Sequence, residues 1–217
     1  MPGFLVTFEG VEGCGKTTQA ELLRDELKKH GHRVVMTREP GGTEIGERIR
    51  QILLDRDLGA MEPLTELFLY LAARAQNVQE LIRPALREGA IVICDRFADA
   101  SLAYQGSGRE IGPSRVEELN RIATFGTQPD YTVLLDVPVE VGMERKSAGA
   151  AGAAERDRIE REELDFHSRV REGYLSLAQE FPERVEVFDG TRAAAELATE
   201  ISGRITRMLE ERSGKSR

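Results

Sequence analysis

Short runs of apolar, mostly β-branched residues alternate along the chain with longer segments in which apolar residues recur every three or four positions. The short runs are apolar at nearly every position, as in strands that are buried on both faces of a parallel sheet. They predict five strands, at residues 5–8, 34–37, 90–94, 132–137 and 185–188.

The longer segments carry apolar stripes at helical spacing, which predict helices that face a core. The stripes are Ala20, Leu23 and Leu27, then Phe166, Val170, Tyr174, Leu177 and Phe181, and finally Ala194, Leu197, Ile201, Ile205 and Met208. Pro63 and Pro113 predict helix starts, and Ser114 with Glu117 predicts a capping box.

Strands that alternate with helices in a chain of 217 residues predict one α/β domain over residues 1–217, a five-stranded parallel sheet wrapped by helices on both faces. One segment departs from this pattern. Residues 147–154 read SAGAAGAA, without an apolar anchor and between basic residues. We interpret this segment as a mobile loop.

Acidic residues outnumber basic ones by 38 to 30, so the net charge is −8. Without a basic field, the chain is expected to bind neither nucleic acid nor an anionic membrane. The apolar runs are far shorter than the roughly 20 residues that span a bilayer, and the N-terminus does not read as a secretory signal, so we expect a cytoplasmic protein. Two cysteines and three scattered histidines argue against a disulfide scaffold or a zinc site.

Residues 10–17 read GVEGCGKT, the pattern G-x-x-x-x-G-K-[ST] between a predicted strand and a predicted helix. The glycines let backbone N–H groups turn inward on a phosphate at the helix N-terminus. Lys16 is expected to reach the β- and γ-phosphates of ATP, and Thr17 to ligate Mg²⁺. The predicted ATP-binding residues of this phosphate loop are Gly10, Val11, Glu12, Gly13, Cys14, Gly15, Lys16, Thr17 and Thr18.

A phosphate loop alone does not identify a reaction, because kinases, ATPases and GTPases share it. The chain has two asparagines, Asn77 and Asn120, and neither begins the Asn-Lys-x-Asp pattern that reads guanine. A GTPase switch is therefore disfavoured. An ATP-dependent enzyme and an ATP-driven regulator both remain open.

Two arginines follow predicted strands, Arg38 in TREPGGT and Arg96 in CDRF. The carboxyl ends of parallel strands meet at one crevice, so both guanidinium groups are expected to face the phosphate loop. This arrangement suits an acceptor that is itself a phosphate, because its oxygen is already charged and needs no general base. Asp95 ends the same strand as Arg96 and is, with Thr17, the second candidate ligand of Mg²⁺.

The segments TREPGGT, CDR and SLAYQGSGR (101–109) follow the phosphate loop in this order. In these motifs the chain closely resembles the bacterial thymidylate kinases, which are P-loop nucleoside monophosphate kinases. The resemblance covers roughly residues 4–163 and continues weakly beyond. It implies a P-loop kinase fold, a homodimer, and transfer of the γ-phosphoryl group of ATP to dTMP, giving dTDP and ADP in dTTP synthesis.

The resemblance also implies a set of dTMP-binding residues, which are Glu12, Arg38, Tyr70, Arg74, Arg96, Ser101, Tyr104 and Gln105. By it, Arg38 and Arg96 hold the phosphate and Arg74 contacts a thymine carbonyl. Tyr70 stands where the family usually has a phenylalanine that stacks on thymine, one helical turn before Arg74.

Three further roles are implied for the sugar and the base edge. Ser101 and Gln105 resemble the polar groups near the base, and Tyr104 resembles the ring that leaves no room for a ribose 2′-hydroxyl. Glu12 resembles the acid that engages the 3′-hydroxyl of the acceptor.

Gly13 occupies a position at which some family members place an arginine that touches the γ-phosphate. The bacterial type supplies this charge from a lid, here at about residues 145–158. Arg156 and Arg158 are the candidate lid cations, and Arg145 resembles an adenine-stacking residue. The expected catalytic set is Lys16, Arg96, Glu12, Arg156 and Arg158.

Two rival functions stay open. An enzyme of the same chemistry could use another nucleoside monophosphate or a deoxynucleoside as acceptor. A switch-like ATP-binding protein would bind nucleotide without transfer, but it would leave the pair Arg38 and Arg96 unexplained.

Overall fold

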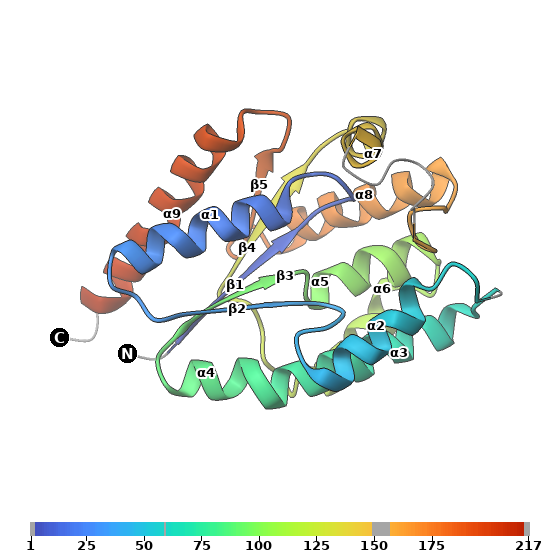
Figure 1. The fold of residues 1–217 in the computed structure, drawn as a ribbon, viewed down its shortest axis with the longest axis horizontal. Coiled ribbons are helices and arrows are strands. Elements are labelled where there is room, and N and C mark those ends of the chain that lie inside the picture. Colours follow the sequence, from blue (N-terminus) through green and yellow to red (C-terminus); the bar gives the residue numbers. More distant parts are fainter. Residues whose placement is uncertain (1–2, 59, 149–156, 215–217) are drawn as a thin grey trace.

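The structure, a computed structural model, describes residues 3–58, 60–148 and 157–214. Its centre is a five-stranded sheet in the order β2-β3-β1-β4-β5, with every neighbouring pair parallel (Figure 1). The strands are β1 (Phe4–Glu9), β2 (Val34–Arg38), β3 (Ile91–Asp95), β4 (Tyr131–Asp136) and β5 (Val185–Asp189). The five predicted strands are confirmed, each within one residue at either end.

The connections between strands are helical. The α-helices are α1 (Lys16–Lys29), α2 (Glu44–Leu54), α3 (Pro63–Asn77), α4 (Arg83–Arg87), α5 (Ala98–Ser101), α6 (Pro113–Ala123), α7 (Val139–Ala148), α8 (Leu164–Glu180) and α9 (Ala194–Gly214). Two stretches are wound more widely, as π-helices: η1 (Val78–Ile82) and η2 (Leu102–Gly108). Because η1 joins α3 to α4 without a break, these three elements form one long helical rod.

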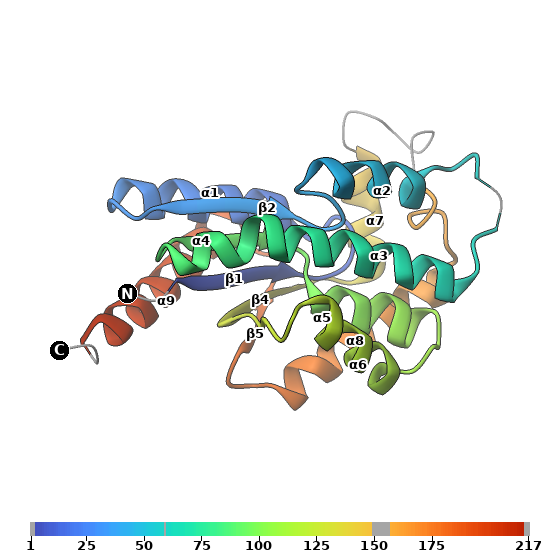
Figure 2. The same cartoon turned by 90° about the horizontal axis from the view of Figure 1, so that it is seen from below.

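Helices cover both faces of the sheet, as its apolar strands predict. Figure 1 shows α1 and α9 above the sheet and the rod of α3, η1 and α4 below it. Val6 of β1 packs in one core with Leu23 of α1, whereas its neighbour Leu5 packs in a second core with Val78 and Ile82 of η1. Figure 2, seen from below, shows the rod running in nearly the same direction as β1 and β2, with α5, α6 and α8 beside its α3 end.

The carboxyl ends of the three strands β1, β2 and β3 lie side by side. Asp95 of β3 is in register with Phe8 of β1 on one side and with Arg38 of β2 on the other. The phosphate loop leaves β1 one residue after Glu9. The register therefore brings the loop, Arg38 and the Asp95–Arg96 pair to one edge of the sheet.

Most helix predictions hold. The stripe of α1 is buried, and so are the first four stripe residues of α8, Phe166, Val170, Tyr174 and Leu177. Pro63 and Pro113 begin α3 and α6. Ala194 at the start of α9 is exposed. The capping box is wrong, because Ser114 already lies inside α6 and the N-cap position belongs to Gly112.

The loop predicted at 147–154 lies, from residue 149 onward, outside the described residues, and so does Arg156. No helix in the described part of the chain is long and apolar enough to cross a membrane.

Candidate active site

The phosphate loop connects β1 to the N-terminus of α1 and depends on left-handed glycine conformations. Gly10, Gly13 and Gly15 have φ angles of 136°, 70° and 101°, which glycine adopts without steric cost. A Cβ on Gly13 would also collide with the carbonyl oxygen of Gly142 in α7. An arginine at position 13 therefore does not fit this loop, which agrees with the need for a cation from elsewhere.

Lys16 is buried and lies over the loop. Its Nζ donates hydrogen bonds to the carbonyl oxygens of Val11 at 2.9 Å and Gly10 at 3.2 Å. The ammonium group is therefore held at the N-terminus of α1, where the helix dipole also favours an anion.

Thr17 and Asp95 form the other polar pair at this helix end. The Thr17 hydroxyl donates to Oδ2 of Asp95 at 2.6 Å. A hydroxyl and a carboxylate side by side next to a phosphate loop are the hard oxygen donors that Mg²⁺ prefers, with phosphate oxygens and water completing its octahedron. The residues present therefore fit a nucleotide-bound Mg²⁺.

Arg96 lies at the centre of the site, in a left-handed backbone conformation with a φ angle of 69°. Its Nη1 donates to the carbonyl of Gly10 and to the hydroxyl of Tyr174, both at 3.0 Å. Its Nη2 donates to Glu12 at 2.6 Å and to the hydroxyl of Tyr104 at 3.0 Å. Four contacts on two nitrogens hold the guanidinium group in one orientation.

Glu12 forms the ion pair with Arg96 and also accepts a hydrogen bond from Tyr104 at 3.2 Å. Burial alone would raise the pKa of Glu12, but the charges of Arg96, Lys16 and Lys146 outweigh it and lower the pKa to about 2. Glu12 is therefore ionised at neutral pH, and it can accept hydrogen bonds but not donate them.

A first cavity surrounds the phosphate loop. Its lining includes Lys16, Thr17, Arg38, Asp95 and Arg96. The structure thus brings both arginines of the predicted second anion site to the phosphate loop. Arg38 is exposed and donates from Nη2 to Glu47 at 3.0 Å, so it is held less rigidly than Arg96.

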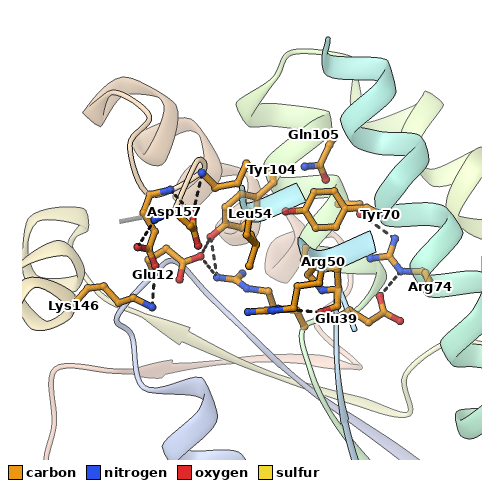
Figure 3. A pocket seen from close by; sticks show the side chains of 16 residues that line it. Glu12, Glu39, Arg50, Leu54, Tyr70, Arg74, Tyr104, Gln105, Lys146 and Asp157 are labelled. Atoms are coloured by element: carbon orange, nitrogen blue, oxygen red, sulfur yellow. Dashed lines mark hydrogen bonds and ion pairs between the residues drawn. The ribbon is translucent and has the colours of Figure 1, made fainter. Parts of the chain in front are cut away.

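A second cavity opens beside the first and encloses about 620 Å³, part of it open to solvent (Figure 3). The expected base- and sugar-binding residues Tyr70, Arg74, Ser101, Tyr104 and Gln105 all line it. The two cavities share a set of lining residues, Glu12, Glu39, Arg50, Arg96 and Lys146.

Arg74 is almost fully buried, yet it borders the second cavity. Nε donates to Glu39 at 2.7 Å, Nη1 donates to Ser101 and Asn120, and Nη2 donates to the carbonyl of Phe97. Among the described residues, these bonds use every N–H of the guanidinium group except one on Nη2, which can donate to a ligand.

Tyr104 and Gln105 lie on the π-helical stretch η2, which follows α5. Wider winding of this kind often occurs at functional sites because it redirects side chains. Ser101, at the end of α5, and these two residues reach the same cavity. Tyr104 stacks beneath Arg96, with the guanidinium carbon 4.8 Å from its ring centre.

The two described lid arginines lie in different places. Arg145 lines the first cavity and donates to the carbonyl of Gly190 at 2.7 Å. Arg158 instead donates from Nε to the carbonyl of Leu53 and forms an ion pair with Glu66 at 2.7 Å. The contact of Arg158 with a transferring phosphate stays a prediction, and Arg156 lies outside the described residues.

Several site residues were missed by the sequence analysis, namely Glu9, Glu39, Arg50, Lys146, Asp157, Glu160 and Tyr174. Glu39 stands in the motif TREPGGT and Lys146 follows Arg145, so the motifs pointed near them. Arg50 of α2 carries no comparable signal. Tyr174 was assigned to the core, and its ring is buried there, but its hydroxyl contacts both Arg96 and Glu9.

Glu9 ends β1 within the buried core. It accepts hydrogen bonds from the backbone N–H of Phe97 at 2.7 Å and from Tyr174 at 2.8 Å. Burial, with the negative charge of Asp99, raises the pKa of Glu9 to about 8. Glu9 therefore holds the Tyr174 hydroxyl by accepting its hydrogen bond, and that hydroxyl in turn accepts a hydrogen bond from Arg96.

Comparison with known proteins agrees with this geometry. The family model for thymidylate kinase matches residues 8–201. A thymidylate kinase of Geotalea uraniireducens is 52% identical over 212 residues, covering 96% of this chain and 99% of that protein. One of Geobacter sulfurreducens is 52% identical over 202 residues, covering 92% and 95%.

Solved structures lead to the same family. The crystal structure of thymidylate kinase from Ehrlichia chaffeensis has a TM-score of 0.74 and 31% sequence identity, covering 96% of this chain and 99% of that chain. The fold of this chain is thus shared with that of a solved thymidylate kinase. With a family model that matches most of its length and relatives that are half identical to it, this chain belongs to the thymidylate kinase family.

Proposed function

We propose that this enzyme transfers the γ-phosphoryl group of ATP to dTMP, giving dTDP and ADP. The observation that carries the proposal is the meeting of two cavities at Arg96 and Glu12. One cavity contains the phosphate loop, and the other has an aromatic ring and a polar edge that suit a nucleoside. A phosphoryl donor and a nucleotide acceptor can therefore face each other across one guanidinium group.

The donor half consists of the phosphate loop and Lys16. Backbone N–H groups at the start of α1 and the Lys16 ammonium would hold the β- and γ-phosphates. Thr17 and Asp95 would hold Mg²⁺, which supplies positive charge to the phosphate oxygens. Arg145, at the rim of the same cavity, is the candidate for contact with adenine.

The acceptor phosphate is assigned to Arg96 and Arg38. Because the terminal nitrogens of Arg96 already donate to Glu12, Tyr104, Tyr174 and Gly10, a phosphate has to use Nε or take the place of Glu12. Glu12 would then be released toward the 3′-hydroxyl of the acceptor. The acceptor oxygen is already anionic, so positioning and charge stabilisation carry the reaction without a general base.

The base and sugar are assigned to the second cavity. The Nη2–H that is left on Arg74 can donate to a base carbonyl, and Tyr70 offers a ring face for stacking. Ser101 and Gln105 form the polar edge, and Tyr104 forms the wall beside the sugar. The lid cation expected near the γ-phosphate is assigned to Arg156, because Arg158 is engaged by Glu66.

The test is acceptor preference in one coupled assay with ATP and Mg²⁺, comparing dTMP, dUMP, dCMP, dAMP and thymidine. The proposal expects dTMP to have the highest kcat/KM and thymidine to be inert, since thymidine lacks the phosphate that Arg96 and Arg38 are proposed to bind. A higher value for another monophosphate would reassign the acceptor. Nucleotide binding without transfer to any of them would favour the ATP-driven switch instead.

The proposal includes a homodimer in the cytoplasm, where ATP and nucleoside monophosphates are available. An apolar surface on two neighbouring helices supports the dimer. Leu64 and Phe68, one turn apart on α3, are each 54% exposed, and Ile122 and Phe125 at the end of α6 are 64% and 53% exposed. Large exposed apolar side chains, here above all Leu64 and Phe68 in adjacent turns of one helix, are typical of a protein interface.

Phe68→Asp is therefore expected to convert the dimer to a monomer, because a charge would be buried at the interface. Light scattering coupled to size-exclusion chromatography measures the mass directly. Leu22→Asp is the matched control, since Leu22 is an exposed leucine on α1, away from this surface. A wild-type monomer, or a dimer that persists in Phe68→Asp, would contradict the assignment.

A further inference from the structure

Glu66 of α3 is a buried carboxylate that has no part in the mechanism above. Its side chain is 0% exposed, and it lies one turn before Tyr70 on the same helix. A carboxylate in this position is costly unless charges and hydrogen bonds compensate for the lost water. The compensating groups come from distant parts of the chain.

Three side chains compensate the charge of Glu66, two by hydrogen bonds and Arg158 by an ion pair alone. Arg109 donates from Nε at 3.2 Å and from Nη2 at 3.0 Å, and Arg158 forms an ion pair at 2.7 Å. The third is Gln105, whose Nε2 donates at 2.9 Å. Burial alone would raise the pKa of Glu66, but hydrogen bonds from Arg109 and Gln105 and the charges of Arg109 and Arg158 outweigh it and lower the pKa.

An ionised carboxylate can only accept hydrogen bonds, and this settles how the Gln105 amide is turned. The amide must present its nitrogen to Glu66, so its oxygen is directed to the other side. Gln105 is almost fully buried and lines the acceptor cavity. Figure 3 shows its carboxamide above the Tyr70 ring, with the oxygen on the side of that ring. Within the described residues, the oxygen has no hydrogen bond from another side chain.

Arg74 supplies the complementary group at the same cavity. Its remaining Nη2–H is a donor, and the Gln105 oxygen is an acceptor. A base that satisfies both needs a carbonyl next to a ring N–H, which thymine and uracil have. Cytosine presents the reverse pattern, an amino group next to an unprotonated ring nitrogen.

We propose that Glu66 is a specificity-determining positioning residue, which fixes the Gln105 amide so that the cavity selects a pyrimidine with a ring N–H over cytosine. Arg109 and Arg158 serve this role by keeping Glu66 in its acceptor-only form. This inference rests on the proposed function, because it concerns the acceptor site of that reaction.

The experiment compares dUMP with dCMP, because these acceptors differ only at the ring edge in question and both lack the thymine methyl group. The readout is the ratio of their kcat/KM values with ATP. In the wild-type enzyme we expect a preference for dUMP of at least about 100-fold, since a mismatched donor and acceptor leave buried polar groups unpaired. A wild-type preference below about tenfold overturns the proposed orientation without any variant.

Glu66→Gln has the same shape but can donate as well as accept, so the Gln105 amide can turn. We expect the dUMP/dCMP ratio to fall at least about tenfold.

Glu66→Asp is the second variant. It keeps the charge for both arginines but retracts the carboxylate from Gln105 by one methylene, and the ratio is expected to fall there too. Glu62→Gln removes the same charge from an exposed position, the N-cap of α3, and should leave the ratio unchanged.

A purely structural role would lower activity on both acceptors and leave their ratio unchanged, which would overturn the inference. Gln105→Met provides the second check. In that background Glu66→Gln should change the ratio no further, because its effect is transmitted through the amide. An equal change in both backgrounds would show that Glu66 acts by another route.

The outcomes separate the two proposals. Absence of transfer to every monophosphate by the wild-type enzyme would contradict the proposed function itself. Efficient use of dTMP, with a dUMP/dCMP ratio that does not respond to Glu66, would contradict the specificity role alone.

Discussion

Lys16→Ala is expected to lower kcat with ATP and dTMP by about 10³-fold or more, because it removes a charge aimed at the phosphates in a preorganised site. The Lys16 Nζ is already held by the carbonyls of Gly10 and Val11. It also donates to Sγ of Cys14, so a phosphate has to take the place of at least one of these three acceptors, within reach of the same nitrogen. A coupled assay of ADP formation measures the effect.

Lys28→Ala is the matched control, since Lys28 is an exposed lysine in the last turn of the same helix. It should retain wild-type turnover. The thermal midpoint of Lys16→Ala should stay close to that of the wild type, because the loop conformation depends on its glycines and on α1. Near-normal kcat in a folded Lys16→Ala enzyme would contradict the assignment of the phosphate loop.

Arg96→Lys is expected to lower kcat by about 10²-fold, and Arg96→Ala by more. The guanidinium group serves four protein acceptors at once and is also assigned to the acceptor phosphate. A lysine ammonium has three N–H groups in a compact cluster and cannot reproduce this planar geometry. The loss should be larger in kcat than in the affinity for dTMP, because the charge on the phosphate is redistributed in the transition state.

The control is Arg121→Lys, an exposed arginine on α6. Its kinetics should match those of the wild type. Full activity of Arg96→Lys would mean that only net charge matters at this position, and the argument from guanidinium geometry would fall.

The sheet was predictable because its strands are buried on both faces. Runs such as 90–94 are apolar throughout, and no other element of this length suits such a run between turn residues. The N-terminus of α6 was not predictable to the residue. Ser114 and Glu117 have the spacing of a capping box, but Pro113 starts the helix one position earlier, with Gly112 in a left-handed conformation.

The residues of the site also include some that the sequence could predict and some that it could not. Arg38, Asp95 and Arg96 were predictable because parallel strands bring their carboxyl ends to one edge, whatever lies between them in sequence. The contact between Glu66 and Gln105 spans 39 residues and joins two different helical elements. Nothing in local spacing indicates such a contact, because it depends on how α3 and η2 pack.

Lid residues illustrate another limit. A basic residue near a mobile loop suggests phosphate binding, and Arg158 fits that pattern in sequence. Its partner in the structure is instead a buried acid on α3, and charge alone cannot distinguish these two roles.

At Arg96, the left-handed backbone conformation lowers the stability of the fold, whereas the side chain is needed for activity. A residue with a Cβ loses about 1–2 kcal/mol in this conformation, and glycine does not. Glycine at position 96 would relieve that strain while removing the guanidinium group on which both cavities converge. Selection of variants for heat resistance alone is therefore expected to enrich an inactive protein, and any programme to stabilise this enzyme should hold position 96 constant.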